Sequence, residues 1–383
     1  MACPSGSPTN TSESSRAPVS AADDPNGASR NVRRVSRRPS FPLDAPAKGA
    51  GTTRYRHLRP ARPAKTWIRR INPATFRDTP LEHGQPSAAS TDGCRPQAVD
   101  VPAVTHRRTG KGTMSGTQFL ERPGGTLAYS VAGAGPLVIC SPGVGDLRST
   151  FTDLARLLVA GGLQVATVEL RGHGESSTDW PSYTESDVAD DLLALSKELD
   201  DRPAVLLGSN FSGQAAVMAA AKAPDSVAGI VLSRAFVKGT PYNPMARAMT
   251  SLAAVPGLGR TLWMSHWPTL FATKPANFEQ RRHELADSLT GPGRFEPVRE
   301  MLKSDHIAEQ ALPDATCPAL VVIGDRDPDC PDPAAEAVAT ADRLGGPATV
   351  LVVPDAGHYP HAEDPERVAL TVVAFVRDLV QAH

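Results

Sequence analysis

The stretch LGSNFSG, residues 207–213, stands between an apolar run and an alanine-rich one. Ala204–Gly208 is short, apolar and followed by turn residues, which predicts a buried strand. Phe211–Ala221 carries mostly small side chains and predicts a closely packed helix. The sharp turn between them is centred on Asn210. The stretch therefore predicts a strand that passes through one turn into a helix.

The same alternation of strands and helices continues on both sides of this turn. Strands are predicted at 126–131, 136–140, 164–169, 228–233, 319–324 and 349–353, and helices at 151–160, 188–199, 334–343 and 366–381. Continuous β-branched runs that alternate with helices indicate a mostly parallel central sheet with helices on both faces. The predicted fold class is therefore α/β, in three layers.

Residues 1–113 differ in composition from the rest of the chain. They are rich in Pro, Arg, Ser, Ala and Thr, with 19 Lys and Arg against 8 Asp and Glu. Such a segment buries too little apolar surface to offset its ordering entropy, so we expect a disordered basic extension. It could be a basic arm for nucleic acid or a partner, a transit peptide, or a segment upstream of a native start at Met114. We expect residues 114–383 to form the folded domain.

The alternation is interrupted at about residues 236–312. Apolar and aromatic residues punctuated by Pro and Gly predict short helices in this insertion, carrying Met245, Met249, Leu252, Trp263, Met264, Trp267, Leu270 and Phe271. Two interpretations are open. The helices form a cap that lines an apolar ligand pocket, or they form a packing layer.

Charge and composition narrow the partners and the compartment. Residues 114–383 carry 21 Lys and Arg against 33 Asp and Glu, which does not favour nucleic-acid binding by the folded domain. No apolar run reaches the ~18–20 residues of a membrane span, and no secretory signal pattern is present. Five cysteines at no metal-like spacing favour a reducing compartment, so we expect a cytoplasmic protein. No nucleotide-binding loop is found, so no cofactor is expected. Oligomeric state is not indicated.

Four further motifs accompany the LGSNFSG turn: CSPGVGD at 140–146, ELRGHGES at 169–176, ALVVIGDRDPDCPDP at 319–333 and VVPDAGHYPHAEDPE at 352–366. Together with the order of elements, they resemble the α/β-hydrolase fold superfamily over residues 117–383. In that superfamily a Gly-x-Ser-x-Gly elbow presents a nucleophile, and an acid and a histidine follow in the chain. The resemblance implies a capped, esterase-like hydrolase acting on a small apolar ester or related carbonyl compound.

Sterics select the residue at the tip of the elbow, because the positions two before and two after the tip must be small. Ser209 or Ser212 at the tip would place large side chains there. Asn210 at the tip leaves Gly208 and Ser212, which are both small. Asn also tolerates positive φ. A carboxamide has no proton that a base could remove to create an attacking oxygen, so we expect impaired hydrolysis.

The resemblance also implies the partners of the nucleophile position. Asp327, three residues after Gly324, is the expected acid; a solvated acidic turn, a helix N-cap near Asp332 and a calcium loop are the alternatives. His358 is the expected base, with Asp327 fixing its tautomer and orientation. His361 and Glu363 are expected to pack or pair nearby. A metal site formed by the two histidines is not favoured.

An oxyanion hole needs two backbone N–H groups aimed at one point. The resemblance assigns them to Phe211, after the tip, and to Val144, where Pro142-Gly143 stands in place of the more frequent His-Gly. In the ELRGHGES loop, Arg171 is expected to pair and His173 to be structural.

Three functions are therefore compatible with the sequence. The first is an ester-type hydrolase weakened by Asn210. The second is a non-covalent His–Asp acid/base catalyst of lyase or cyclase type, in which Asn210 donates a hydrogen bond. The third is a non-catalytic protein that binds an apolar ligand or a partner.

Overall fold

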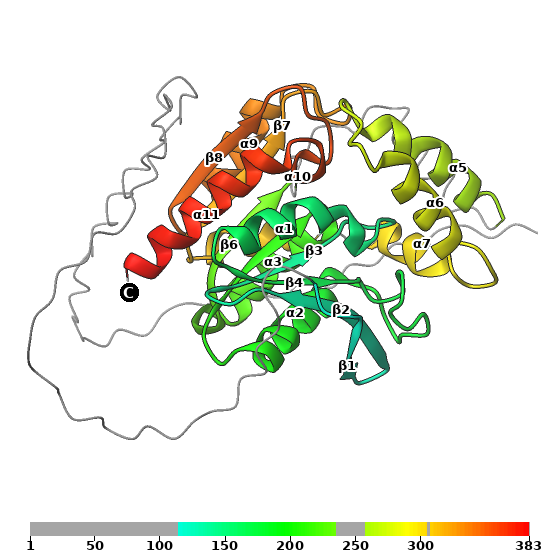
Figure 1. Ribbon diagram of the computed structural model, residues 1–383, viewed down its shortest axis with the longest axis horizontal. Coiled ribbons are helices and arrows are strands. Elements are labelled where there is room, and N and C mark those ends of the chain that lie inside the picture. Colours follow the sequence, from blue (N-terminus) through cyan, green and yellow to red (C-terminus); the bar gives the residue numbers. More distant parts are fainter. Residues whose placement is uncertain (1–113, 235–256, 305–306, 383) are drawn as a thin grey trace, which may run out of the picture. The chain divides into compact units, whose positions relative to one another are not determined.

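The computed structural model describes residues 114–234, 257–304 and 307–382 (Figure 1). The predictions made for 1–113 and for Met245, Met249 and Leu252 lie outside the described residues.

A single eight-stranded sheet forms the centre of the domain, in the order β1-β2-β4-β3-β5-β6-β7-β8. The strands are β1 Gln118–Arg122, β2 Gly125–Ala132, β3 Leu137–Ser141, β4 Gln164–Val168, β5 Ala204–Ser209, β6 Val227–Ser233, β7 Ala319–Gly324 and β8 Ala348–Val353. β1 and β2 are antiparallel to their neighbours and all the other pairs are parallel. The predicted α/β class with a mostly parallel sheet is confirmed.

Helices cover both faces of this sheet. The helices are η2 Arg148–Phe151, α1 Thr152–Ala160, α2 Glu185–Leu199, α3 Phe211–Lys222, η3 Pro224–Ser226, α5 Gly259–His266, η4 Trp267–Leu270, α6 Phe278–Ser288, α7 Glu296–Lys303, α8 Ala308–Ala311, η5 Leu312–Asp314, α9 Pro333–Arg343, α10 Pro360–Glu363 and α11 Pro365–Gln381. α1 and α11 share one buried cluster, while α2, α3 and α9 share the other. Figure 1 shows the two sets on opposite sides of the strands.

Strand β3 illustrates why the central strands are apolar throughout. Leu137 and Ile139 belong to the cluster on the α2–α3 side, whereas Val138 and Cys140 belong to the cluster on the α1–α11 side. Successive side chains of a strand point to opposite faces, so a strand covered on both faces needs apolar residues at every position. This pattern explains why the central strands could be located from continuous apolar runs.

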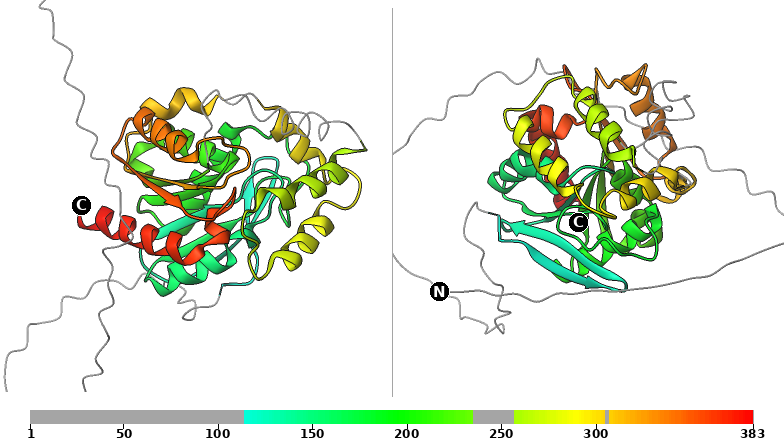
Figure 2. Two further views of the ribbon diagram at one scale, coloured as in Figure 1. Left: turned by 90° about the horizontal axis from the view of Figure 1, so that it is seen from above. Right: turned by 90° about the vertical axis from the view of Figure 1, so that its right-hand side faces the viewer.

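The insertion between β6 and β7 contains helices α5 to α8, and α5, α6 and α7 stay grouped in both views of Figure 2. Trp267 is fully buried, with its ring centroid 4.7 Å from that of Phe271 and 5.3 Å from that of Phe278. Arg281 of α6 donates to Thr150 Oγ1 at 2.7 Å. The three aromatic residues therefore pack on one another, and the Arg281 bond anchors the insertion to the sheet domain.

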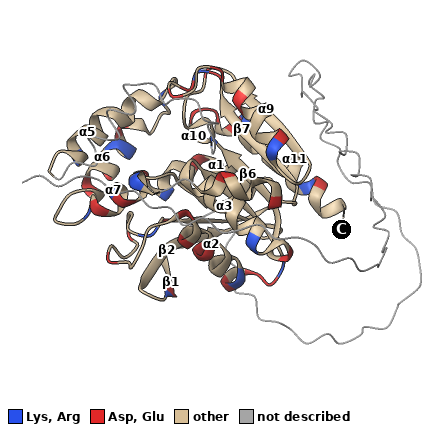
Figure 3. Cartoon of the chain, turned by 180° about the vertical axis from the view of Figure 1, so that it is seen from behind, with Lys and Arg blue, Asp and Glu red and all other residues tan. Residues whose placement is uncertain are grey.

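The surface and the cysteines bear on what composition indicated about membranes and disulfides. No described helix is both long and apolar enough to cross a membrane. Acidic and basic residues are interspersed over the described ribbon (Figure 3). Among the described residues, Cys140, Cys317 and Cys330 are all free thiols, and burial raises the pKa of each.

The ends of β5, β6 and β7 meet at one edge of the sheet. Ser209 is in register with Ser233, and Ser233 with Val322. The backbone N–H of Asn210 donates to Ser233 O at 3.0 Å, and that of Arg234 donates to Val322 O at 2.9 Å. The residues that directly follow β5 and β6 therefore emerge side by side.

Gly208 is required by the close approach of β5 to the first turn of α3. A Cβ atom at this position would lie 2.3 Å from the carbonyl carbon and oxygen of Ser212. We expect Gly208→Ala to lower the free energy of unfolding by about 2 kcal/mol or more, because the backbone of the turn must shift. Urea unfolding monitored by circular dichroism measures this change.

Gly116→Ala is the matched control, because a Cβ atom at Gly116 would meet nothing within 4 Å. Equal unfolding midpoints for the two variants would show that the elbow tolerates a side chain at Gly208.

Candidate active site

Asn210 forms the tip of the turn between β5 and α3, with φ 48° and ψ −113°. Only three non-glycine residues of the described chain have positive φ, and two of them, Asn210 and Arg234, follow neighbouring strands at the same sheet edge. Strained backbone of this kind persists only where the surrounding structure holds it, and it clusters at functional sites. The conformation is the one that the sequence predicts for this asparagine.

The two serines of the turn are placed away from the site. Ser209 is fully buried as the last residue of β5, and Ser212 is fully buried in the first turn of α3. Ser212 Oγ donates to Pro142 O and accepts from Ser141 Oγ at 2.8 Å. The Ser212 hydroxyl therefore ties the elbow to the loop after β3 instead of facing a substrate.

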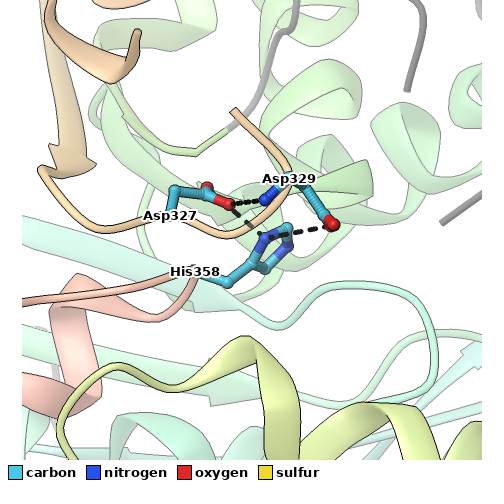
Figure 4. A group of neighbouring side chains, drawn as sticks. All are labelled: Asp327, Asp329 and His358. Atoms are coloured by element: carbon cyan, nitrogen blue, oxygen red, sulfur yellow. Dashed lines mark hydrogen bonds and ion pairs between the residues drawn. The ribbon is translucent and has the colours of Figure 1, made fainter. Parts of the chain in front are cut away.

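His358 lies opposite the tip of the turn. Asn210 Nδ2 is 3.1 Å from His358 Nε2, and the amide can donate only if Nε2 is unprotonated. The proton of the neutral imidazole is then on Nδ1, which lies 3.5 Å from Asp327 Oδ2 (Figure 4). The backbone N–H of His358 donates to Leu270 O at 2.9 Å. The site thus contains a buried histidine poised between a carboxamide and a carboxylate.

Asp327 has a second partner that sequence reasoning missed. Arg234 Nε donates to Asp327 Oδ2 at 2.6 Å, and both side chains are almost completely buried. The backbone N–H of Asp329 donates to the other carboxylate oxygen at 2.9 Å. Burial raises the pKa of Asp327, but its interactions with Arg234 and His358 outweigh the effect of burial and hold this pKa well below its usual range. The carboxylate is therefore ionised.

The other acidic residues of the loop after β7 have separate places. Asp329 Oδ2 lies 3.8 Å from His358 Nδ1, and Asp332 Oδ1 accepts from the Ala335 N–H as the N-cap of α9. One potential ligand atom each from Asp327, Asp329 and His358 lies within 4.8 Å of the others. Because the Arg234 guanidinium already bonds one of these oxygens, the cluster offers a cation less negative charge than its carboxylates suggest.

The loop after β3 lies against the tip of the turn. A Cβ atom at Gly143 would be 3.1 Å from Asn210 Cβ, so the two backbones approach closely. Val144 follows in this loop, and Phe211 is the first residue of α3. The oxyanion roles of the Val144 and Phe211 N–H groups remain predictions.

His173 has the structural place expected of it. Its Nε2 accepts from the Gly145 N–H at 2.9 Å, and its Nδ1 is 3.1 Å from Arg171 O, which requires a proton on Nδ1. Burial is the main reason that the pKa of His173 falls to about 4, and Arg294 lowers it further. Arg171 itself makes two bonds to Asp191, at 2.8 and 2.9 Å.

Two further residues of the VVPDAGHYPHAEDPE motif support the loop of His358. His361 is buried, with Nδ1 3.0 Å from Ser233 Oγ and Nε2 3.1 Å from Thr150 Oγ1. Glu363 Oε2 accepts from the N–H groups of Ala272, Thr273 and Gly357, at 2.8 to 2.9 Å. These contacts pack and pair both residues, as expected, and bind the insertion to the loop that carries the base.

A strained strand–turn–helix tip facing a buried His–Asp pair, at the end of a mostly parallel sheet, defines the α/β-hydrolase class of proteins. The sequence model of the family described as "Alpha/beta hydrolase family" matches residues 137–371 of this chain. The chain belongs to this family.

Similar proteins include several hydrolases. The chain is 27% identical over 265 residues to 2-(acetamidomethylene)succinate hydrolase of Mesorhizobium japonicum, covering 66% of this chain and 91% of that protein. Its fold is similar to that of a thermophilic esterase of Thermogutta terrifontis, with a TM-score of 0.57 and 25% identity. The match covers 70% of this chain and 99% of the esterase chain. The fold is also similar to that of haloalkane dehalogenase DbeA of Bradyrhizobium elkani, with a TM-score of 0.59 and 21% identity. The match covers 71% of this chain and 100% of the dehalogenase chain. The family and the Mesorhizobium japonicum relative support a hydrolase, and the dehalogenase shows the shared fold.

His173 gives the fold a pH dependence whose sign is fixed by its lowered pKa. Between about pH 6.5 and pH 4 the unfolded chain binds a proton at His173 and the folded chain does not, so stability is lost as the pH falls through this range. The variant His173→Gln keeps an acceptor for the Gly145 N–H. Between pH 7 and pH 4 we expect its free energy of unfolding to fall by about 2 kcal/mol less than that of the parent. Urea unfolding at several pH values measures the difference.

The comparison uses the slope of stability against pH, so the loss that the substitution causes at pH 7 does not affect it. Parallel curves for parent and variant would contradict a neutral buried His173.

Proposed function

We propose that this protein hydrolyses a small apolar ester or related carbonyl compound through His358 and Asp327, without a covalent intermediate. The proposal is carried by the 3.1 Å contact between Asn210 Nδ2 and His358 Nε2 at the tip of the strained turn. A carboxamide in this place cannot form an acyl-enzyme. With a base still present, water is the nucleophile that the site can use.

In this mechanism His358 Nε2 takes a proton from water as the water oxygen attacks the carbonyl carbon. The imidazolium then returns the proton to the leaving alcohol, and the Asp327 carboxylate keeps the ring oriented. The N–H groups of Val144 and Phe211 are the proposed donors to the developing oxyanion. Asn210, which is only partly buried, can turn its amide N–H from Nε2 to water or substrate.

The similar proteins support the reaction class more than the substrate. The relative from Mesorhizobium japonicum, of which this chain covers 91%, is by name a hydrolase. We propose the apolar ester only as the substrate class that the fold family implies, and the cytoplasm as the compartment that the free thiols fit.

The decisive variant is Asn210→Ser, which restores a hydroxyl at the tip. Loss of a covalent nucleophile can cost ~10⁶ in kcat, so we expect the variant to hydrolyse p-nitrophenyl esters orders of magnitude faster than the parent. A pre-steady-state burst of p-nitrophenol in the variant alone would mark the acyl-enzyme. Stopped-flow absorbance measures both quantities.

His358→Gln in the parent chain is the matched control and should abolish the slow parental hydrolysis. If folded Asn210→Ser shows neither a burst nor a rate increase, Asn210 does not occupy the nucleophile position.

A second function, ligand binding without turnover, is favoured by the resting contacts of the site. The lone pair of His358 Nε2 faces the Asn210 amide, and the Asp327 carboxylate is bonded by Arg234. A protein of this kind would show a rise in melting temperature with ester or carboxylate ligands and form no product. Turnover by the parent that is lost in His358→Gln excludes this alternative.

A further inference from the structure

Arg234 changes the charge balance of the His–Asp pair. Its guanidinium is 2.6 Å from Asp327 Oδ2, the same oxygen that lies 3.5 Å from His358 Nδ1. Arg234 is always protonated and Asp327 is ionised, so the two form a buried pair of zero net charge. A proton taken up by His358 would therefore add a positive charge next to a group that is already neutralised.

Asp329 supplies a second carboxylate beside His358, and the Arg234 guanidinium does not neutralise it as it neutralises Asp327. Its carboxylate Oδ2 lies 3.8 Å from His358 Nδ1, and its side chain is only 13% exposed (Figure 4). Within the described residues, the His358 imidazole is the one basic side chain within 4.0 Å of this carboxylate. The backbone N–H of Asp329 donates to Asp327 Oδ1, which fixes the two carboxylates relative to each other.

We propose that Asp329 is a positioning residue that serves as the counter-ion of protonated His358, because Arg234 neutralises Asp327. This inference rests on the proposed role of His358 as a base. It assigns the orientation of the ring to Asp327 and the stabilisation of its charge to Asp329. In a reaction that passes through an imidazolium, the two tasks of the acid then belong to two carboxylates.

Other titratable groups face His358 from neighbouring elements. Asp146 in the loop after β3 interacts with it electrostatically, as do His266 of α5 and the buried His361 of α10. His266 also feels the charge of Asp329. All of them remain in place in the Asp327, Asp329 and Arg234 variants below, so differences between those variants report on these three residues.

The test is an NMR titration of the His358 imidazole in the complete chain, with the signals assigned through His358→Gln and His266→Gln. Removing an opposite charge at this distance shifts a titration midpoint by about one pH unit. We expect Asp329→Asn to lower the His358 midpoint by about that amount. We expect Arg234→Gln/Asp327→Asn, which removes a neutral pair, to leave it close to the parent value.

The paired variant is used because Asp327→Asn alone would remove the carboxylate that the buried Arg234 Nε bonds and would endanger folding. Arg234→Gln frees the Asp327 carboxylate, so the effect of Asp329→Asn should be smaller in that background. An unchanged midpoint in Asp329→Asn, or an equal fall in the paired variant, would overturn the proposal. The titration needs no substrate, so failure of the proposed hydrolysis would appear separately, in the ester assays.

Discussion

The close approach of β5 to the first turn of α3 is the constraint on which the site depends. Because Gly208 has no Cβ, the backbone of Ser212 can pass over it, and the chain reverses at Asn210 with positive φ. This reversal points the Asn210 side chain at His358 Nε2. The Ser212 hydroxyl then joins the same turn to the loop after β3. The geometry of the elbow is thus maintained although its tip carries no nucleophilic hydroxyl.

The parts of this structure that could be predicted from the sequence are those whose information is local. Once the resemblance to the α/β-hydrolase elbow is recognised, residue sizes select the tip of the β5–α3 turn. The same resemblance implies the places of Asp327 and His358, in motifs that follow strands. Arg234 carries no such signal. Its contact with Asp327 depends on the parallel register of β6 with β7 and on positive φ at an arginine, which no sequence pattern announces.

The role of the insertion also could not be predicted from the sequence. Its aromatic residues predicted an apolar layer, but their count cannot distinguish a ligand pocket from a packing core. The structure buries Trp267 between Phe271 and Phe278, which assigns these three to packing. The roles of the elbow, the acid and the oxyanion donors remain predictions.

The hydrogen bonds of Glu363 couple the insertion mechanically to the loop of His358. Its carboxylate receives N–H groups from Ala272 and Thr273 on the insertion and from Gly357 beside the base, while His358 itself donates to Leu270 O. The histidine and the segment 270–273 are therefore fastened as one unit. A ligand that moved the segment 270–273 would therefore move the His358 imidazole as well. Binding at the insertion and the orientation of the base are coupled in this protein.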